Sequence, residues 1–189
     1  MRPATIARMT DASLAAPEPL PPLRPTLGFM LSHPAHMVAL GFGSGLAPKG
    51  AGTVGTLWAW LTFIVLQPWL TDWQWAVLLA LSFALGWWAC MRCAQALRQA
   101  DPGAIVWDEI LGFWIVLWLV TPTSFWGQLA SFALFRLFDI AKPGPVGWAD
   151  RLYKAHSGDT IGARHGFGIL FDDLMAALCT LLVIALWRM

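Results

Sequence analysis

The sequence predicts an all-α integral membrane protein, built as a helical bundle of apolar segments. Of its 189 residues, 58% are hydrophobic and only 12% are charged, whereas a soluble domain carries about 25% charged residues. The apolar residues form long unbroken stretches, which is typical of helices that cross a bilayer. Thirteen tryptophans agree with this, because Trp is enriched where membrane spans meet water. The net charge of +1 indicates no acidic or basic partner, and we expect no nucleic acid.

The N-terminal region has a different composition. Residues 1–26 are rich in Pro and Ala and lack the apolar core of a signal peptide, so we expect a disordered, uncleaved tail. Residues 27–189 would then form a single membrane-embedded domain. Its first stretch, residues 27–40, is moderately apolar and is broken by Pro34. This pattern favours a short interfacial helix over a membrane span.

Four or five apolar segments follow, at roughly residues 54–70, 73–97, 108–120, 123–140 and 166–187. Only Thr71 and Asp72 separate the first two, and Thr-Pro-Thr at 121–123 joins the next two, so we expect two hairpins followed by a C-terminal helix. The third segment is short. From Ile110 to Val120 a helix covers about 16 Å, against a hydrocarbon core of about 30 Å. Either this helix begins near Ile105, or the second hairpin is re-entrant.

Hairpins determine on which side of the membrane the charged residues lie, because a hairpin returns the chain to its starting side. The opposite hairpin tips carry only Asp72 as a charge. The excess of Lys and Arg on the other side puts that side in the cytoplasm, so we expect a bacterial inner-membrane protein whose site faces the cytoplasm. We expect the following residues to converge there: Lys49, Asp108, Glu109, Arg136, Asp139, Lys142, Asp172 and Asp173.

Adjacent carboxylates at Asp172 and Asp173 are the most specific signal. Each costs about 2.5 to 3.5 kcal/mol at the bilayer centre on insertion scales, and the two repel each other. A divalent cation relieves both problems, and Mg²⁺ prefers carboxylates, waters and phosphate oxygens. The alternative is that the two side chains reach out to water, or pair with Arg136 or Arg164.

Two further groups of charged residues can also be explained without any role in catalysis. Asp108 and Glu109 open a helix, where acidic residues interact favourably with the helix dipole. The hairpin argument nevertheless places them beside the other acidic pair. Arg136, Asp139 and Lys142 are spaced three apart and share a helix face. They form either a ladder of ion pairs, or a set in which Asp139 binds metal and the cations bind phosphate.

A glycine-rich loop precedes the first apolar segment. Six glycines fall within residues 41–55, and they let backbone N–H groups approach an anion near a helix N-terminus. Lys49 adds a point charge, while Ser44 and Thr53 add hydroxyl donors. The order of residues is not that of the nucleotide-binding P-loop. Taken alone, such a loop is more often a simple turn.

Cysteines and histidines contribute little. Cys90 and Cys93 lie in an apolar helix and Cys179 lies in another, so we expect all three to serve packing. No zinc spacing is present. His165 precedes the acidic helix, where a hydrogen-bonded or solvated imidazole is the simpler reading than contact with substrate. The remaining histidines show no metal-binding pattern.

Four stretches resemble the phosphatidylglycerophosphatase A family in order: GFGSGLAPKGAGTVGTL (41–57), VWDEILGFW (106–114), FRLFDIAKPGPVGWADR (135–151) and GFGILFDDLMAAL (166–178). The resemblance covers residues 34–187. The family usually reads Pro-Gly-Thr where this chain has Ala51-Gly52-Thr53, which should loosen the loop slightly. The resemblance implies an all-helical, Mg²⁺-dependent enzyme that converts phosphatidylglycerophosphate to phosphatidylglycerol.

This resemblance and the charge pattern lead to one mechanistic hypothesis. The expected metal ligands are Asp108, Glu109, Asp139, Asp172 and Asp173. The expected phosphate-binding residues are Lys49, Arg136, Lys142, Ser44 and Thr53. The expected catalytic carboxylates are Asp173, Glu109 and Asp139, of which Asp173 or Glu109 would take a proton from the attacking water. Attack by Asp108 or Asp172 on phosphorus is a less favoured alternative.

Other functions fit parts of this pattern. The nearest rival is a phosphatase of a different lipid, such as an isoprenyl phosphate. A small ion-coupled carrier is a more distant rival, because it would place polar groups through the whole membrane depth, whereas here the far halves of several segments are almost purely apolar. The sequence leaves the oligomeric state, the number of metal ions, the acyl-chain preference and the number of complete crossings open.

Overall fold

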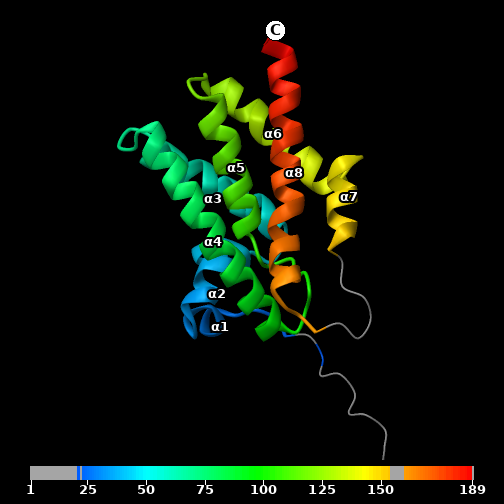
Figure 1. The fold of residues 1–189 in the computed structure, drawn as a ribbon. Coiled ribbons are helices and arrows are strands. Elements are labelled where there is room, and N and C mark those ends of the chain that lie inside the picture. The colour runs from blue at the N-terminus through cyan, green and yellow to red at the C-terminus, as the bar shows by residue number, and fades with distance from the viewer. Residues whose placement is uncertain (1–20, 22, 154–159, 189) are drawn as a thin grey trace, which may run out of the picture.

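The computed structural model describes residues 21, 23–153 and 160–188, and these residues form helices and connecting loops without any strand. The elements are α1 (Leu27–Leu31), α2 (Pro34–Ala39), the 3₁₀ segment η1 (Gly41–Leu46), α3 (Ala51–Leu66), α4 (Asp72–Leu97), α5 (Trp107–Val120), α6 (Phe125–Ala141), α7 (Pro145–Leu152) and α8 (Ala163–Arg188) (Figure 1). The all-α prediction is therefore confirmed for this part of the chain.

Two of the helices are long and apolar enough to cross a membrane: α4, and residues 163–187 of α8. Helix α3 is apolar but shorter. Helices α3, α4, α5, α6 and α8 overlap the four or five predicted apolar segments. That all of them cross a membrane stays a prediction.

Helix α5 shows how the short third segment is built. It begins at Trp107 and has 14 residues, so it is about 21 Å long and falls short of a hydrocarbon core of about 30 Å. Ile105 and Val106 are not helical. Instead, the Val106 N–H group donates a hydrogen bond to Ala39 O (2.9 Å), which ties the start of α5 to the end of α2.

The predicted interfacial helix at 27–40 is two short helices, α1 and α2. His33 separates them with extended backbone, φ −156° and ψ 139°, because the residue before a proline disfavours the helical conformation. Most of the predicted tail lies outside the described residues. Leu23, at the edge of that tail, donates its N–H group to Leu97 O (3.1 Å). The short helices η1 and α7 were not predicted.

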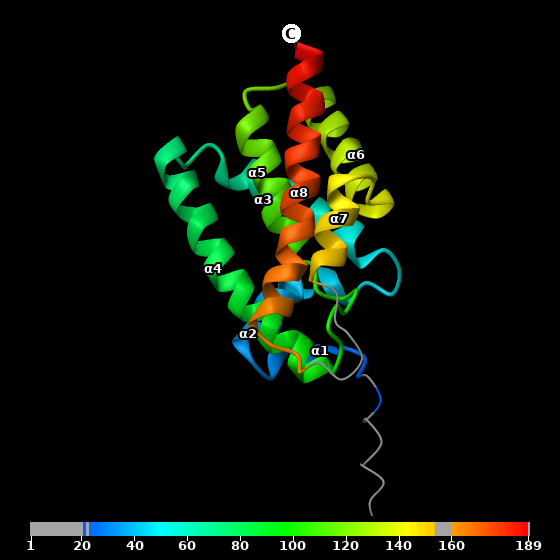
Figure 2. The same ribbon diagram turned by 45° about the vertical axis from the view of Figure 1, so that its right-hand side comes forward.

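The chain reverses direction at both predicted turns, and α5 and α6 pack against each other, whereas α3 and α4 each pack mainly against other helices. Thr71 caps α4 in a capping box with Gln74, and Ser124 caps α6 through the Gly127 N–H group. The α3–α4 and α5–α6 turns point toward the same end of the bundle as the C-terminus of α8, whereas α1 and α2 lie at the other end (Figures 1 and 2). The start of α3, the start of α5 and the end of α6 therefore lie away from the hairpin tips.

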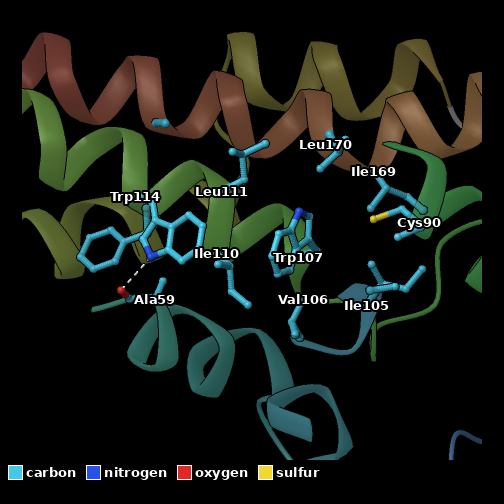
Figure 3. Packing of buried hydrophobic residues seen from close by; sticks show 14 of the residues in the cluster. Ala59, Cys90, Ile105, Val106, Trp107, Ile110, Leu111, Trp114, Ile169 and Leu170 are labelled. Carbon is cyan, nitrogen blue, oxygen red and sulfur yellow. Dashed lines mark hydrogen bonds between the residues drawn. The ribbon is translucent and has the colours of Figure 1, made fainter. Parts of the chain in front are cut away.

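Helix α5 is the centre of the core. It packs against α3, α4, α6 and α8, and Figure 3 shows its residues Trp107, Ile110 and Leu111 between α3 and α8. The Trp114 indole N–H donates to Ala59 O (3.0 Å) on α3. Apolar residues on every side of a helix are typical of one that is surrounded by protein. This central position places Asp108 and Glu109, in its first turn, at a meeting point of several helices.

Two cysteines confirm the packing prediction. Cys90 and Cys93 are free thiols, and both are buried in the core on α4. Cys179 on α8 is also a free thiol, is partly buried, and packs against the same core.

Candidate functional site

Four carboxylates from three helices lie together near the start of α5. Asp108 and Glu109 come from α5, Asp139 from α6 and Asp173 from α8. One oxygen each of Asp108, Glu109 and Asp173 lie within 4.8 Å of one another. The Asp139 carboxyl group lies close enough to interact with those of Asp173 and Glu109. We call these four residues the acidic cluster.

The acidic cluster contains oxygens that lack a partner. Asp108 Oδ1, Glu109 Oε2 and Asp173 Oδ2 are buried and accept no hydrogen bond within the described part of the chain. Asp173 is only 2% exposed. Burying a carboxylate without a partner is costly, and several carboxylates at one place repel one another. A bound cation would remove both costs.

The acidic cluster offers carboxylate oxygens, the kind of ligand that Mg²⁺ prefers. Mg²⁺ binds carboxylate oxygens at 2.0 to 2.1 Å in octahedral geometry, so opposite ligands lie about 4.2 Å apart. Neighbouring ligands in the same octahedron lie about 3 Å apart, so the three oxygens, which lie within 4.8 Å of one another, would move closer together to bind one ion. Asp108, Glu109 and Asp173, whose buried oxygens lack partners, are therefore the residues that could hold this ion.

Arg136 on α6 connects the acidic cluster to α3. Its Nη1 atom lies 2.5 Å from Asp139 Oδ2 and 3.7 Å from Glu109 Oε1. The same atom donates a hydrogen bond to Thr56 Oγ1 (3.3 Å). Arg136 Nε is buried with no partner among the described residues. The predicted ion-pair reading of Arg136 and Asp139 is thus present, and the guanidinium lies at the edge of the candidate metal site.

Asp172 and Asp173 face different neighbours. Consecutive residues on an α-helix point about 100° apart, so Asp173 joins the acidic cluster while Asp172 faces α6 and α7. The Lys142 ammonium lies 2.5 Å from Asp172 Oδ2 and 2.6 Å from Asp150 Oδ1. We call Lys142, Asp150 and Asp172 the lysine cluster. The sequence prediction treated Asp172 and Asp173 as one pair, and the structure divides them.

Electrostatics keep the Lys142 ammonium charged. Burial acts to lower the pKa of Lys142, but hydrogen bonds to Asp150 and Asp172 outweigh it, and the pKa lies above its ordinary value. The ammonium is therefore protonated at neutral pH. Asp172 Oδ1 is buried without a hydrogen-bond partner, so this carboxylate still has one oxygen available.

The glycine-rich loop reaches the acidic cluster through its backbone. A Cβ atom at Gly52 would overlap Glu109 Oε1 and would lie 3.1 Å from Arg136 Nη2. Glycine at this position therefore lets the first turn of α3 pack directly on these two side chains.

The three residues of this loop that were predicted to bind phosphate are linked less directly to the acidic cluster. Lys49 is exposed and forms no ion pair with the residues that the structure describes. The Ser44 hydroxyl donates to Gly41 O (2.9 Å), which closes the turn of η1. Thr53 is partly buried in the first turn of α3. Their roles in phosphate binding stay predictions.

Sequence reasoning missed two residues that hold these clusters in place. Thr56 is completely buried, and its hydroxyl donates to Gly52 O (2.8 Å) while it accepts from Arg136. It lies one turn after Gly52 on the same face of α3, a spacing that could have signalled it. Asp150 lies within the third family-like stretch, but nothing predicted α7, the helix that carries it.

A small hollow adjoins the lysine cluster. Asp101, Asp150, Tyr153, His165 and Asp172 contribute to its lining. His165 is buried, and its Nδ1 atom accepts a hydrogen bond from the Gly162 N–H group (3.2 Å) at the start of α8. The simpler predicted reading of a hydrogen-bonded histidine therefore fits.

Fold and site together define a class of protein: in its described residues it is all-helical, with two candidate membrane helices and a group of carboxylates on α5 and α8 that could hold a cation. Comparison with known proteins then gives the family. The family model described as phosphatidylglycerophosphatase A matches residues 37–188, and the chain belongs to this family, whose named members are phosphoric monoester hydrolases. No solved structure matches the chain.

Curated relatives agree with the family assignment. A Haemophilus influenzae protein named phosphatidylglycerophosphatase A is 37% identical over 154 residues, covering 82% of this chain and 88% of the relative. An Escherichia coli protein of the same name is 36% identical over 152 residues, covering 77% of this chain and 78% of the relative. A Bacteroides thetaiotaomicron protein, whose name provisionally assigns it phosphatidylinositol-3-phosphatase activity, is 33% identical over 158 residues and covers 80% of this chain and 92% of the relative.

Proposed function

We propose that this protein is a Mg²⁺-dependent phosphatase that hydrolyses phosphatidylglycerophosphate to phosphatidylglycerol and phosphate at the cytoplasmic face of the bacterial inner membrane. The observation that carries the proposal is the set of unpartnered, buried oxygens on Asp108, Glu109 and Asp173. Family membership supplies the reaction class and the substrate.

The acidic cluster would hold the metal. Asp108, Glu109 and Asp173 provide the oxygens that lie close together, and Asp139 completes the set from α6. Bound Mg²⁺ polarises a phosphoryl group and makes a water more acidic. Arg136 lies closer to Asp139 than to Glu109, so we assign Asp173 or Glu109 as the carboxylate that accepts the proton of the attacking water.

Cationic residues around the acidic cluster would bind the phosphoryl oxygens. Arg136 and Lys142 each come from the end of α6 and neutralise charge as the ester bond breaks. We propose that Asp172, together with Asp150, orients the Lys142 ammonium. Lys49, Ser44 and Thr53 in the glycine-rich region would add donors to the phosphate from the α3 side.

The distribution of tryptophan and charge supports the membrane orientation. Trp69, Trp73, Trp126 and Trp187 are largely exposed. Trp69 lies in the α3–α4 turn, and the other three lie at the ends of α4, α6 and α8 that are on the same side as the hairpin turns. Exposed Trp is typical of the membrane–water boundary. Both charge clusters lie away from these tips, on the side that the excess of Lys and Arg assigns to the cytoplasm.

A second candidate substrate is another lipid phosphomonoester. The Bacteroides relative bears the name of a phosphatase that acts on an inositol lipid, so the substrate can differ among similar chains. An isoprenyl phosphate would present the same terminal phosphate on an apolar chain. The acidic cluster would serve each of these substrates in the same way.

The decisive experiment uses the full chain purified in detergent. Phosphate release is measured from phosphatidylglycerophosphate, phosphatidylinositol 3-phosphate and an isoprenyl phosphate, each with Mg²⁺, with EDTA, and with Mg²⁺ restored after EDTA. We expect release from phosphatidylglycerophosphate that EDTA abolishes and Mg²⁺ restores. Release that continues in EDTA would refute the metal assignment, and preference for either other lipid would change the substrate.

A further inference from the structure

Helix α3 carries an apolar groove along its outer face. One hollow lies between η1 and the first half of α3 and is lined in part by Phe42, Val54 and Leu57. A second hollow continues along α3 to Val65 and shares Leu61 with the first. From Val54 to Val65 the groove follows α3 for about 17 Å, at 1.5 Å per residue.

The groove offers no charge and few free polar groups. Neither hollow is lined by a charged side chain. The Ser44 hydroxyl at one end donates to Gly41 O, and the Thr62 hydroxyl at the other donates to Trp58 O (2.9 Å) on its own helix. Because these hydroxyl protons are already used, the groove suits an alkyl chain rather than a polar ligand.

The groove begins near the start of α5, the helix that carries Asp108 and Glu109 of the acidic cluster. Phe42 has a left-handed backbone conformation, φ 55°, which is uncommon for a residue with a large side chain. This conformation leaves its ring half exposed and in edge contact with Trp107 (6.1 Å between centroids), the residue directly before Asp108. Gly52 packs on Glu109, and the groove residue Val54, two residues later on α3, is exposed on the other side of the helix.

We propose that this groove, named here the α3 groove, binds one acyl chain of the lipid phosphomonoester that the enzyme hydrolyses. The inference rests on the proposed function. A phosphate held at the acidic cluster would place the start of a lipid tail near Phe42, and the groove then leads away from the charged end of the bundle toward Leu66 and the hairpin tip. This direction is the one a lipid of the cytoplasmic leaflet requires.

The test fills the α3 groove and compares substrates of different chain length. Leu61→Trp places a larger side chain midway along the groove. We expect the ratio of kcat/KM for long-chain over dihexanoyl phosphatidylglycerophosphate to fall about tenfold, mainly through KM. A tenfold change equals about 1.4 kcal/mol, the transfer free energy of about two buried methylene groups. Leu81→Trp, on the exposed face of α4, is the matched control and should leave the ratio unchanged.

A binding measurement keeps the test independent of folding effects. A phosphatidylglycerophosphate analogue with a photoreactive diazirine midway along one acyl chain is crosslinked to the wild-type protein, and the labelled peptides are mapped. Labelling of residues 54–65 that excess unlabelled substrate displaces supports the proposal. An unchanged chain-length ratio in Leu61→Trp, or labelling spread equally over α4 and α8, overturns it. Failure of the proposed function would instead appear as wild-type protein that hydrolyses neither substrate.

Discussion

Gly52→Ala should separate the activity of this protein from its stability. An added Cβ at this position would overlap Glu109 Oε1 and approach Arg136 Nη2 to 3.1 Å. The overlapping atom is the end of a flexible side chain, so the fold can adapt by moving the Glu109 carboxylate. Ala is also favoured over Gly within a helix by about 1 kcal/mol. We therefore expect an unfolding temperature equal to or slightly above that of the wild type.

Activity should respond in the opposite direction. Relief of the overlap requires the Glu109 carboxylate to move by about 1 Å, and a misplacement of that size can cost about 100-fold in rate. The carboxylate cannot return to its place, because the added Cβ would occupy that space. We expect kcat for phosphatidylglycerophosphate to fall about 100-fold, together with weaker Mg²⁺ activation, because Glu109 would be displaced from the other oxygens.

The assay pairs phosphate release with thermal unfolding in the same detergent. Gly28→Ala is the matched control, because a Cβ at this helical glycine would meet only Thr26 Oγ1 at 3.9 Å. The control should retain the wild-type rate. A Gly52→Ala variant with activity within about threefold of wild type would show that the position of Glu109 does not govern catalysis, and the reasoning from the packing of α3 on α5 would be wrong.

Other substitutions address single contacts around the clusters. Thr56→Val should lower kcat about five- to tenfold by removing one buried hydrogen bond to a charged group, and Thr56→Ser should restore it; a Val variant as active as Ser would deny the role. Asp173→Asn should abolish most activity and raise the Mg²⁺ concentration needed for half activation. Asp172→Asn should lower kcat with an unchanged Mg²⁺ titration, because Asp172 faces Lys142. Equal Mg²⁺ responses of the two variants would contradict the assignment of Asp172 and Asp173 to different clusters. Lys49→Ala should raise KM several-fold in an assay at low salt, with a smaller effect at high salt since the side chain is exposed; an unchanged KM would remove it from the site.

The convergence of distant charges was predictable because it depends only on topology. Two hairpins return the chain to one side whatever the exact helix ends are, so Asp108, Asp139 and Asp173 were expected at one level and do lie together. The turn residues that make the hairpins are local signals, such as the Thr71 capping box. Apolar helices and their N-terminal caps depend on a few residues that are neighbours in the sequence, so the sequence alone predicts them.

The placement of Asp172 and Asp173 in two different clusters was not predictable in the same way. The rotation of α8 decides that Asp173 faces α5 while Asp172 faces α6 and α7, and this rotation depends on how large side chains pack between helices. For the same reason Asp150 could not be assigned, because its contact with Lys142 requires α7 to fold against α8. Thr56 looks like any small polar residue of an apolar helix until Arg136 is placed beside it.

The close approach of four carboxylates, of which Asp173 is buried and the other three are partly buried, also ties metal binding to the stability of the fold. Without a cation, Asp108, Glu109 and Asp173 have buried oxygens with no partner in the described residues, so the folded state carries a repulsive cost that the unfolded chain lacks. A ligand that binds only the folded state at 100 times its dissociation constant stabilises it by about 2.7 kcal/mol, which shifts the unfolding temperature of a chain of this length by roughly 5 to 10 °C.

We therefore expect EDTA to lower the unfolding temperature of the wild type by an amount of that order, and Mg²⁺ to restore it, in an assay that needs no substrate. Asp173→Asn removes both a ligand and a repelling charge, so this variant should be at least as stable as the wild type in EDTA and should gain little from Mg²⁺. Asp172→Asn should keep most of the wild-type Mg²⁺ shift, because its carboxylate belongs to the lysine cluster. If Asp173→Asn and the wild type respond to Mg²⁺ by the same number of degrees, the cation binds elsewhere in the protein and the acidic cluster has another explanation.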